Sequence, residues 1–121
     1  MTVRISDALR AVALEPHQDL AEALDTYYAP EYTHRSDGRT LGRAAFAEMV
    51  ARTRAAIAGG TVTVLDEITD GKRYAERHLN EITLNDGTVS RREVYIFGEF
   101  AEDGRFRRLT ETGFDVEGGE H

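Results

Sequence analysis

Several ionisable side chains lie inside the predicted strands of this chain rather than in its turns. They are Arg77, His78, Glu93, Glu99 and Glu111. Side chains alternate between the two faces of a strand, so some of these groups must face outward, and the pattern does not settle which ones face the covered side. A carboxylate in an apolar pocket can transfer protons near neutral pH, and an arginine can bind an anionic group. The pattern favours a small-molecule site.

Arg77 and Glu93 lie on neighbouring predicted strands, joined by the turn Asn85-Asp86-Gly87. Counting residues outward from this turn places Glu93 opposite a residue near Leu79, which makes Arg77 its diagonal neighbour. A cross-strand ion pair is the simpler interpretation. In the functional alternative, Arg77 anchors an anionic ligand and Glu93 orients it. His78 is assigned to a structural or outward-facing position.

Tyrosines are expected in the core and in the lining of a pocket, where one hydroxyl can bind a polar group of a ligand. The residues concerned are Tyr27, Tyr28, Tyr32 and Tyr95. The 4 histidines are scattered, without a His-x-x-x-His spacing, so no metal site is expected. There is no cysteine, which excludes disulfides, thiolate metal sites and a Cys nucleophile. No cofactor is expected.

Helical spacing of apolar residues in the N-terminal half predicts helices that would hold these groups in place. The first helix carries Ile5 to Val12, and the second begins at Pro16 and ends before Pro30. A short strand is expected over 31–35, followed by a turn. A third amphipathic helix then carries Phe46 to Ile57, and Gly59-Gly60 is expected to cap its C-terminus.

From Thr61 the spacing becomes typical of strands. Hairpin turns at Asp70-Gly71, Asn85-Asp86-Gly87 and Asp103-Gly104 separate predicted strands over 61–69, 73–84, 88–100 and 105–116. Consecutive hairpins predict an antiparallel sheet, and the helices must cover one of its faces. The predicted fold class is α+β, an α-α-β-α-β-β-β-β cone. We expect one domain over 1–121, with an ordered core over 5–116 and a frayed tail over 117–121.

The central strands, 73–84 and 88–100, are about twice the usual strand length. A long twisted sheet curls, and three helices with few large apolar residues cannot fill its concave side. The remaining space predicts a pocket for a small, partly apolar molecule. Both faces of the sheet carry apolar residues, so a homodimer through the outer face is expected.

The composition excludes some classes of partner. The net charge of −7 argues against nucleic acid, and no stretch approaches the ~18 apolar residues of a membrane span. Charged residues interrupt the first 14 residues, which therefore do not resemble a signal peptide. We expect a cytoplasmic protein that binds neither nucleic acid nor membrane.

Three segments resemble a known superfamily: Tyr28–His34, which leaves the second predicted helix, Gly42–Phe46, which begins the third, and the final hairpin from Asp103–Phe106 to Leu109 and Glu111. With the order of elements over 5–116, they resemble the nuclear transport factor 2-like superfamily and, within it, the SnoaL-like branch. That superfamily includes ketosteroid isomerase, limonene-epoxide hydrolase, polyketide cyclases and non-enzymatic members, so the resemblance does not by itself imply one function.

The resemblance implies a catalytic pair. In the cyclase-like members an acidic residue on the last strand, or an adjacent histidine, acts as acid or base, and Glu111 and His34 are the nearest matches here. In the alternative, His34 binds a backbone carbonyl at the pocket mouth and Glu111 pairs with an arginine. The sequence has no Trp, whereas the last strand of SnoaL-like proteins is commonly Trp-rich. This departure argues against a polyaromatic polyketide substrate.

Three functions are compatible with these observations. A cofactor-independent isomerase, cyclase or hydrolase requires His34, Glu111 and a tyrosine hydroxyl to converge on one cavity. A non-catalytic ligand-binding domain would lack that convergence, or would hold its carboxylates with Arg77 or Arg107. A dimeric interaction domain would have a filled core. The candidate ligand-binding residues are Tyr28, Tyr32, Arg77, Glu93 and Tyr95.

Overall fold

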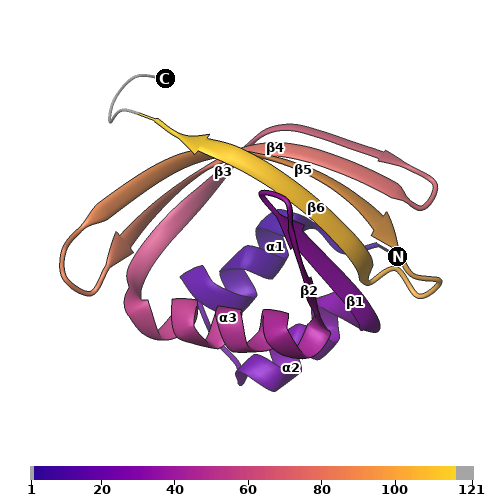
Figure 1. The fold of residues 1–121 in the computed structure, drawn as a ribbon, viewed down its shortest axis with the longest axis horizontal. Coiled ribbons are helices and arrows are strands. Elements are labelled where there is room, and N and C mark those ends of the chain that lie inside the picture. Colours follow the sequence, from indigo (N-terminus) through magenta and orange to yellow (C-terminus); the bar gives the residue numbers. More distant parts are fainter. Residues whose placement is uncertain (1, 117–121) are drawn as a thin grey trace.

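In the computed structural model, which describes residues 2–116, one curved sheet covers a layer of helices (Figure 1). The helices are α1 (Ile5–Leu9), α2 (Leu20–Tyr27) and α3 (Arg43–Ala56), and the π-helical segment η1 (Arg10–Leu14) continues α1. The predicted helices are therefore confirmed, although the second begins later than Pro16. The predicted tail over 117–121 lies outside the described residues.

The described part of the chain contributes 6 strands to the sheet, in the order β2-β1-β6-β5-β4-β3. Their bounds are β1 (Tyr28–Ser36), β2 (Arg39–Gly42), β3 (Ile57–Asp70), β4 (Arg73–Leu84), β5 (Val89–Phe100) and β6 (Phe106–Asp115). The three predicted hairpin turns connect β3 to β6 in sequence, and the bounds predicted for β4 agree with the structure. The α+β cone fold is confirmed.

Two features of the sheet differ from the prediction. β2 was not expected, because Arg39–Gly42 is short and mostly exposed, and it pairs antiparallel with β1. β1 also pairs with β6, and this pairing is parallel, so the sheet is mixed rather than antiparallel. Parallel neighbours cannot be joined by a hairpin, and here residues 37–105 lie between them.

The expected C-terminal cap at Gly59-Gly60 is wrong. α3 ends at Ala56, and both glycines lie in β3, beside a bulge that opens between Ile57 and Gly59. A Cβ on Gly60 would come within 2.8 Å of the Glu81 carbonyl oxygen and 3.0 Å of Leu14 Cδ2. Close packing of the strand against its neighbours, and not helix termination, therefore explains this glycine.

The helices lie against the concave face of the sheet, and the core fills the space between these two layers (Figure 1). Strands β4, β5 and β6 contribute Tyr74, Val94, Ile96, Phe100, Phe106 and Leu109 to this core. The opposite face keeps large apolar side chains in contact with solvent: Phe97 is 71% exposed and Ile68 is 67% exposed. In the described residues, no helix has the length and apolar character needed to cross a membrane.

Candidate active site

His34 reaches the concave face because β1 alternates. Tyr32 and His34 are buried, while Glu31 and Arg35 on the same strand are exposed. The parallel pairing places His34 opposite Leu109 and Ser36 opposite Glu111. His34 and Glu111 are 77 positions apart in the sequence. Their contact therefore depends on the parallel pairing of β1 with β6, which the sequence did not reveal.

Three side chains form a hydrogen-bonded series on this face. The Tyr32 hydroxyl lies 2.7 Å from His34 Nδ1, and His34 Nε2 lies 3.2 Å from Glu111 Oε1. His34 is 6% exposed, whereas the Glu111 side chain is 28% exposed. The structure thus brings His34, Glu111 and a tyrosine hydroxyl together, and the expected alternatives for His34 and Glu111 do not apply.

The Tyr32 hydroxyl is the protonated end of this series. Burial strongly raises the pKa of the Tyr32 hydroxyl, and the nearby Tyr28 and Glu111 raise it further, so this hydroxyl stays protonated. In the neutral form of the His34 ring, this hydroxyl donates to Nδ1, while Nε2 carries the ring proton and donates it to the Glu111 carboxylate. In this arrangement Glu111 is the hydrogen-bond acceptor at the end of the series.

A cavity of about 140 Å³ opens beside this series. Tyr28, His34 and Glu111 lie in its wall, and most of the remaining lining is apolar, including Leu9, Phe46, Met49, Ile96 and Leu109. The Tyr28 hydroxyl makes no hydrogen bond within the described residues, and burial raises its pKa, which keeps it a donor. The cavity therefore combines an apolar body with polar groups along one wall.

Phe46 and Arg43, both on α3, fix the position of the site. The Phe46 ring centroid lies 4.7 Å from that of His34 and 4.9 Å from that of Tyr32. Arg43 donates to the carbonyl oxygens of Ala29 and Tyr28 and forms an ion pair with Asp25 at 2.9 Å. These contacts connect the start of α3 to the segment Tyr28–His34.

A second recess, of about 290 Å³, shares Glu111 and Leu9 with the first cavity. His78, Asn80 and Arg92 contribute polar groups to its wall. His78 is buried and faces inward, next to the buried Glu76. Sequence reasoning missed both residues as site candidates. Counting from the turn before β5 places His78 opposite the apolar Val94, but β5 is apolar on both faces, so the count does not show which face is covered.

Arg77, Glu93 and Tyr95 do not join this site. Their positions alternate with those of the inward-facing residues, so they lie on the opposite face of the sheet. The expected cross-strand ion pair is confirmed, with Arg77 3.4 Å from Glu93 and 2.7 Å from Asp66. The Tyr95 hydroxyl donates to Glu93, which lies opposite Leu79 as predicted from the turn. A role for these three residues in binding a ligand stays a prediction.

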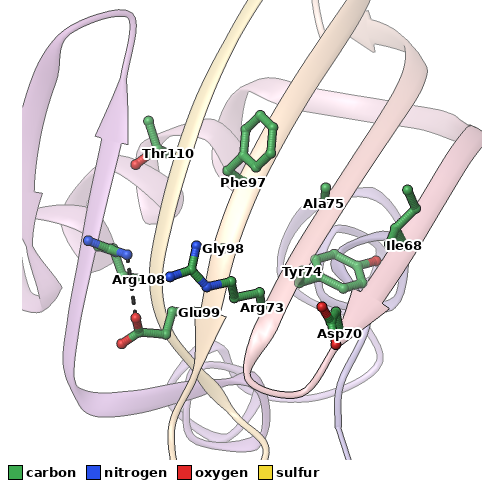
Figure 2. A pocket seen from close by; sticks show the side chains of 10 residues that line it. All are labelled: Ile68, Asp70, Arg73, Tyr74, Ala75, Phe97, Gly98, Glu99, Arg108 and Thr110. Carbon is green, nitrogen blue, oxygen red and sulfur yellow. Dashed lines mark hydrogen bonds and ion pairs between the residues drawn. The ribbon is translucent and has the colours of Figure 1, made fainter.

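The outer face has a shallow depression of about 330 Å³, which Figure 2 shows. Strand pairing places Ile68, Ala75, Phe97 and Thr110 in one row across four strands. The adjacent row alternates in charge: Asp70, Arg73, Glu99 and Arg108. Arg107 and Arg108 both pair with Glu99, at 3.3 and 3.4 Å, so Arg107 does not hold Glu111. Over residues 2–116, no three His, Asp or Glu side chains are grouped to bind a metal.

Solved structures resemble this fold. A candidate isomerase from Rhodopseudomonas palustris has a TM-score of 0.75 and 16% identity, covering 91% of this chain and 86% of its own. A candidate polyketide cyclase from Acidithiobacillus ferrooxidans has a TM-score of 0.71 and 22% identity, covering 90% and 84%. A protein with a ketosteroid isomerase-like fold from Catenulispora acidiphila, solved with trimethylamine, has a TM-score of 0.67 and 18% identity, covering 94% and 86%.

At these identities the similar structures show the fold alone. A search of curated proteins gave no significant match. The family model described as SnoaL-like domain matches residues 8–109, which include His34 and most of the sheet. The chain therefore belongs to the SnoaL-like domain family.

Proposed function

We propose that this protein is a cofactor-independent enzyme that moves protons on a small, partly apolar molecule, as an isomerase or cyclase does. One observation carries the proposal: His34 joins a buried tyrosine to Glu111 in the wall of an apolar cavity. Two similar structures are named as a candidate isomerase and a candidate polyketide cyclase, which agrees with this class of reaction.

Glu111 is the proposed general base. His34 occupies one of its carboxylate oxygens, Oε1, so the other is available to a ligand in the cavity. A carbon-bound hydrogen next to a carbonyl group is a suitable proton source, because the electron pair it leaves is delocalised onto oxygen. His34 acts as a positioning residue, and Tyr32 fixes the tautomer that donates to the base.

Tyr28 is the proposed donor to the ligand. Its hydroxyl has no hydrogen-bond partner in the described part of the chain, and Tyr28 lines the same cavity as Glu111. A protonated, buried hydroxyl can donate a hydrogen bond to a polar group on the body of the ligand. A carbonyl compound with an apolar body is therefore the ligand class that the cavity fits best.

The proposal can be tested with β-tetralone, an apolar bicyclic ketone with exchangeable hydrogens next to its carbonyl group. Exchange of these hydrogens for deuterium in D2O is followed by proton NMR. We expect the wild-type protein to accelerate exchange and Glu111→Gln to lower the rate constant by on the order of 10²-fold. Substitution of the exposed His17 by Gln, as a control, should leave the rate unchanged.

A ligand-binding domain without turnover would give a different result. β-Tetralone would raise the melting temperature of the wild-type protein, because it binds the native state. The rate constant for deuterium exchange, however, would be no higher with the wild-type protein than with Glu111→Gln. That outcome would refute the proposed enzyme and favour binding.

The outer face is the proposed interface of a homodimer. Its apolar row, with Phe97 and Ile68, lies beside a row in which acidic and basic residues alternate (Figure 2). A two-fold axis perpendicular to this row reverses the order of the row in the second copy, so that acidic residues face basic ones. The surface is therefore complementary to a second copy of itself.

A further inference from the structure

Glu76 and His78 form a buried pair that the proposed mechanism does not use. Their side chains are 0% and 1% exposed, and His78 Nδ1 lies 2.6 Å from Glu76 Oε2. A buried ion pair is a poor source of stability, because well-packed apolar residues of similar size are often at least as stable. The pair is therefore a candidate for a role in chemistry.

The two nitrogens of His78 have different surroundings. Nδ1 bonds to Glu76, whereas Nε2 has no hydrogen-bond partner within residues 2–116, and His78 forms part of the wall of the 290 Å³ recess. A carboxylate that binds one ring nitrogen fixes the orientation of the ring and leaves the other nitrogen for a ligand.

Glu111 lies in the wall of the same recess. His78 pairs with Val94 on the next strand, and Val94 pairs with Gly113 on the strand after that. Glu111 lies two residues before Gly113, so the Cα atoms of His78 and Glu111 are two strands and two residues apart. Ordinary strand spacings make this separation about 12 Å. Both side chains point into the concave side, so the gap between their functional atoms suits a small molecule.

We propose that His78 is a second proton-transfer residue, which contacts an oxygen of the same ligand whose carbon Glu111 deprotonates. This inference rests on the proposed function. The ligand would place its apolar body in the 140 Å³ cavity and extend an oxygen-bearing end past Glu111 into the larger recess.

The step balances without a further reactant. The Glu111 carboxylate takes the proton of the C–H bond, and the electron pair of that bond moves through the carbonyl group to its oxygen. The His78–Glu76 pair, when it holds a second proton as Nε2–H, gives that proton to the oxygen and forms the enol. In the reverse step His78 takes the proton back and Glu111 returns a proton to carbon.

Glu76 is the positioning residue for His78, and a series of contacts holds it in turn. The Tyr74 hydroxyl donates to Glu76 Oε1 at 2.8 Å and also contacts Glu67, which forms an ion pair with Arg4 at 2.8 Å. Both oxygens of Glu76 are thereby occupied, so the carboxylate cannot rotate away from His78.

The rate at which the whole chain exchanges the hydrogens of β-tetralone for deuterium tests the role of His78. We expect His78→Gln to lower kcat for exchange by on the order of 10²-fold while KM changes little, because the oxygen gains charge only during the reaction. Glu76→Gln should lower kcat in the same way, and Glu76→Asp should restore part of it. His17→Gln, at an exposed histidine, is the matched control.

The outcomes separate the two proposals. Exchange that requires Glu111 but proceeds at the wild-type rate in both His78→Gln and Glu76→Gln would overturn the role of His78 alone. Absence of protein-catalysed exchange in the wild type would overturn the proposed function and this inference with it. If His78→Gln does not fold, the kcat of Glu76→Gln and Glu76→Asp decides the question.

Discussion

Tyr32 controls His34 because each ring nitrogen has a different partner. A neutral imidazole donates through one nitrogen and accepts through the other, so with a carboxylate at Nε2 and a protonated hydroxyl at Nδ1 the neutral ring has a single consistent arrangement. Removal of the Tyr32 hydroxyl would leave Nδ1 buried without a partner. Glu111 would then receive a less well-oriented hydrogen bond.

Tyr32→Phe should therefore lower both stability and activity. We expect the free energy of unfolding, measured by urea denaturation, to fall by about 1–3 kcal/mol, the cost of an unsatisfied buried acceptor. The β-tetralone exchange rate should fall as well. Tyr27→Phe is the control, since Tyr27 is only partly buried and its hydroxyl makes no hydrogen bond in the described residues. Equal effects of the two substitutions would contradict this role of Tyr32.

At the scale of elements, β3 has a close contact with β4 and η1 at Gly60. Gly60→Ala would bring a methyl group against the backbone of Glu81 and the side chain of Leu14, at 2.8 and 3.0 Å. We expect a loss of about 1–3 kcal/mol in the free energy of unfolding, the usual cost of overpacking.

Gly59→Ala is the matched control, because a Cβ at Gly59 meets no atom within 4 Å. Its free energy of unfolding should change by less than about 1 kcal/mol, and a small gain is expected from the reduced freedom of the unfolded chain. Urea denaturation of both variants would show the difference. A Gly60→Ala variant as stable as Gly59→Ala would mean that β3 can shift away from β4 at little cost.

The sequence predicted the elements that local patterns determine. Asp70-Gly71, Asn85-Asp86-Gly87 and Asp103-Gly104 are turn sequences, and counting from them gave the register of β4 against β5. β2 and the parallel pairing of β1 with β6 depend on contacts between distant residues, which no local pattern records. Gly59-Gly60 was misassigned because glycines at the end of a helix and glycines in a tightly packed strand look alike in a sequence.

The candidate site was predictable only in part, for the same reason. His34 and Glu111 came from a family resemblance, and their contact depends on the parallel pairing. His78 and Glu76 were missed because β5 is apolar on both faces: Ile96 packs inside, while Phe97 lies outside. A sheet with two apolar faces does not reveal which strand parity is covered.

The apolar residues on the outer face of the sheet lead to a prediction about how the whole molecule assembles. Phe97 and Ile68 are 71% and 67% exposed on the outer face, which is unusual for large apolar side chains in one row of a sheet. Association of two copies through this face would remove both from water. We expect light scattering coupled to size-exclusion chromatography to give the mass of a dimer for the wild-type protein.

Phe97→Glu should convert that dimer into a monomer, because it places a charge in the apolar row that the interface would bury. Val89→Glu is the matched control: Val89 is 55% exposed but lies at the other end of β5, away from the row. Both variants should keep the wild-type circular dichroism spectrum.

Since Phe97 points away from the cavity, a monomeric Phe97→Glu that still exchanges β-tetralone would show that the concave site functions within one copy. A wild-type protein that elutes as a monomer at all concentrations would refute the interface.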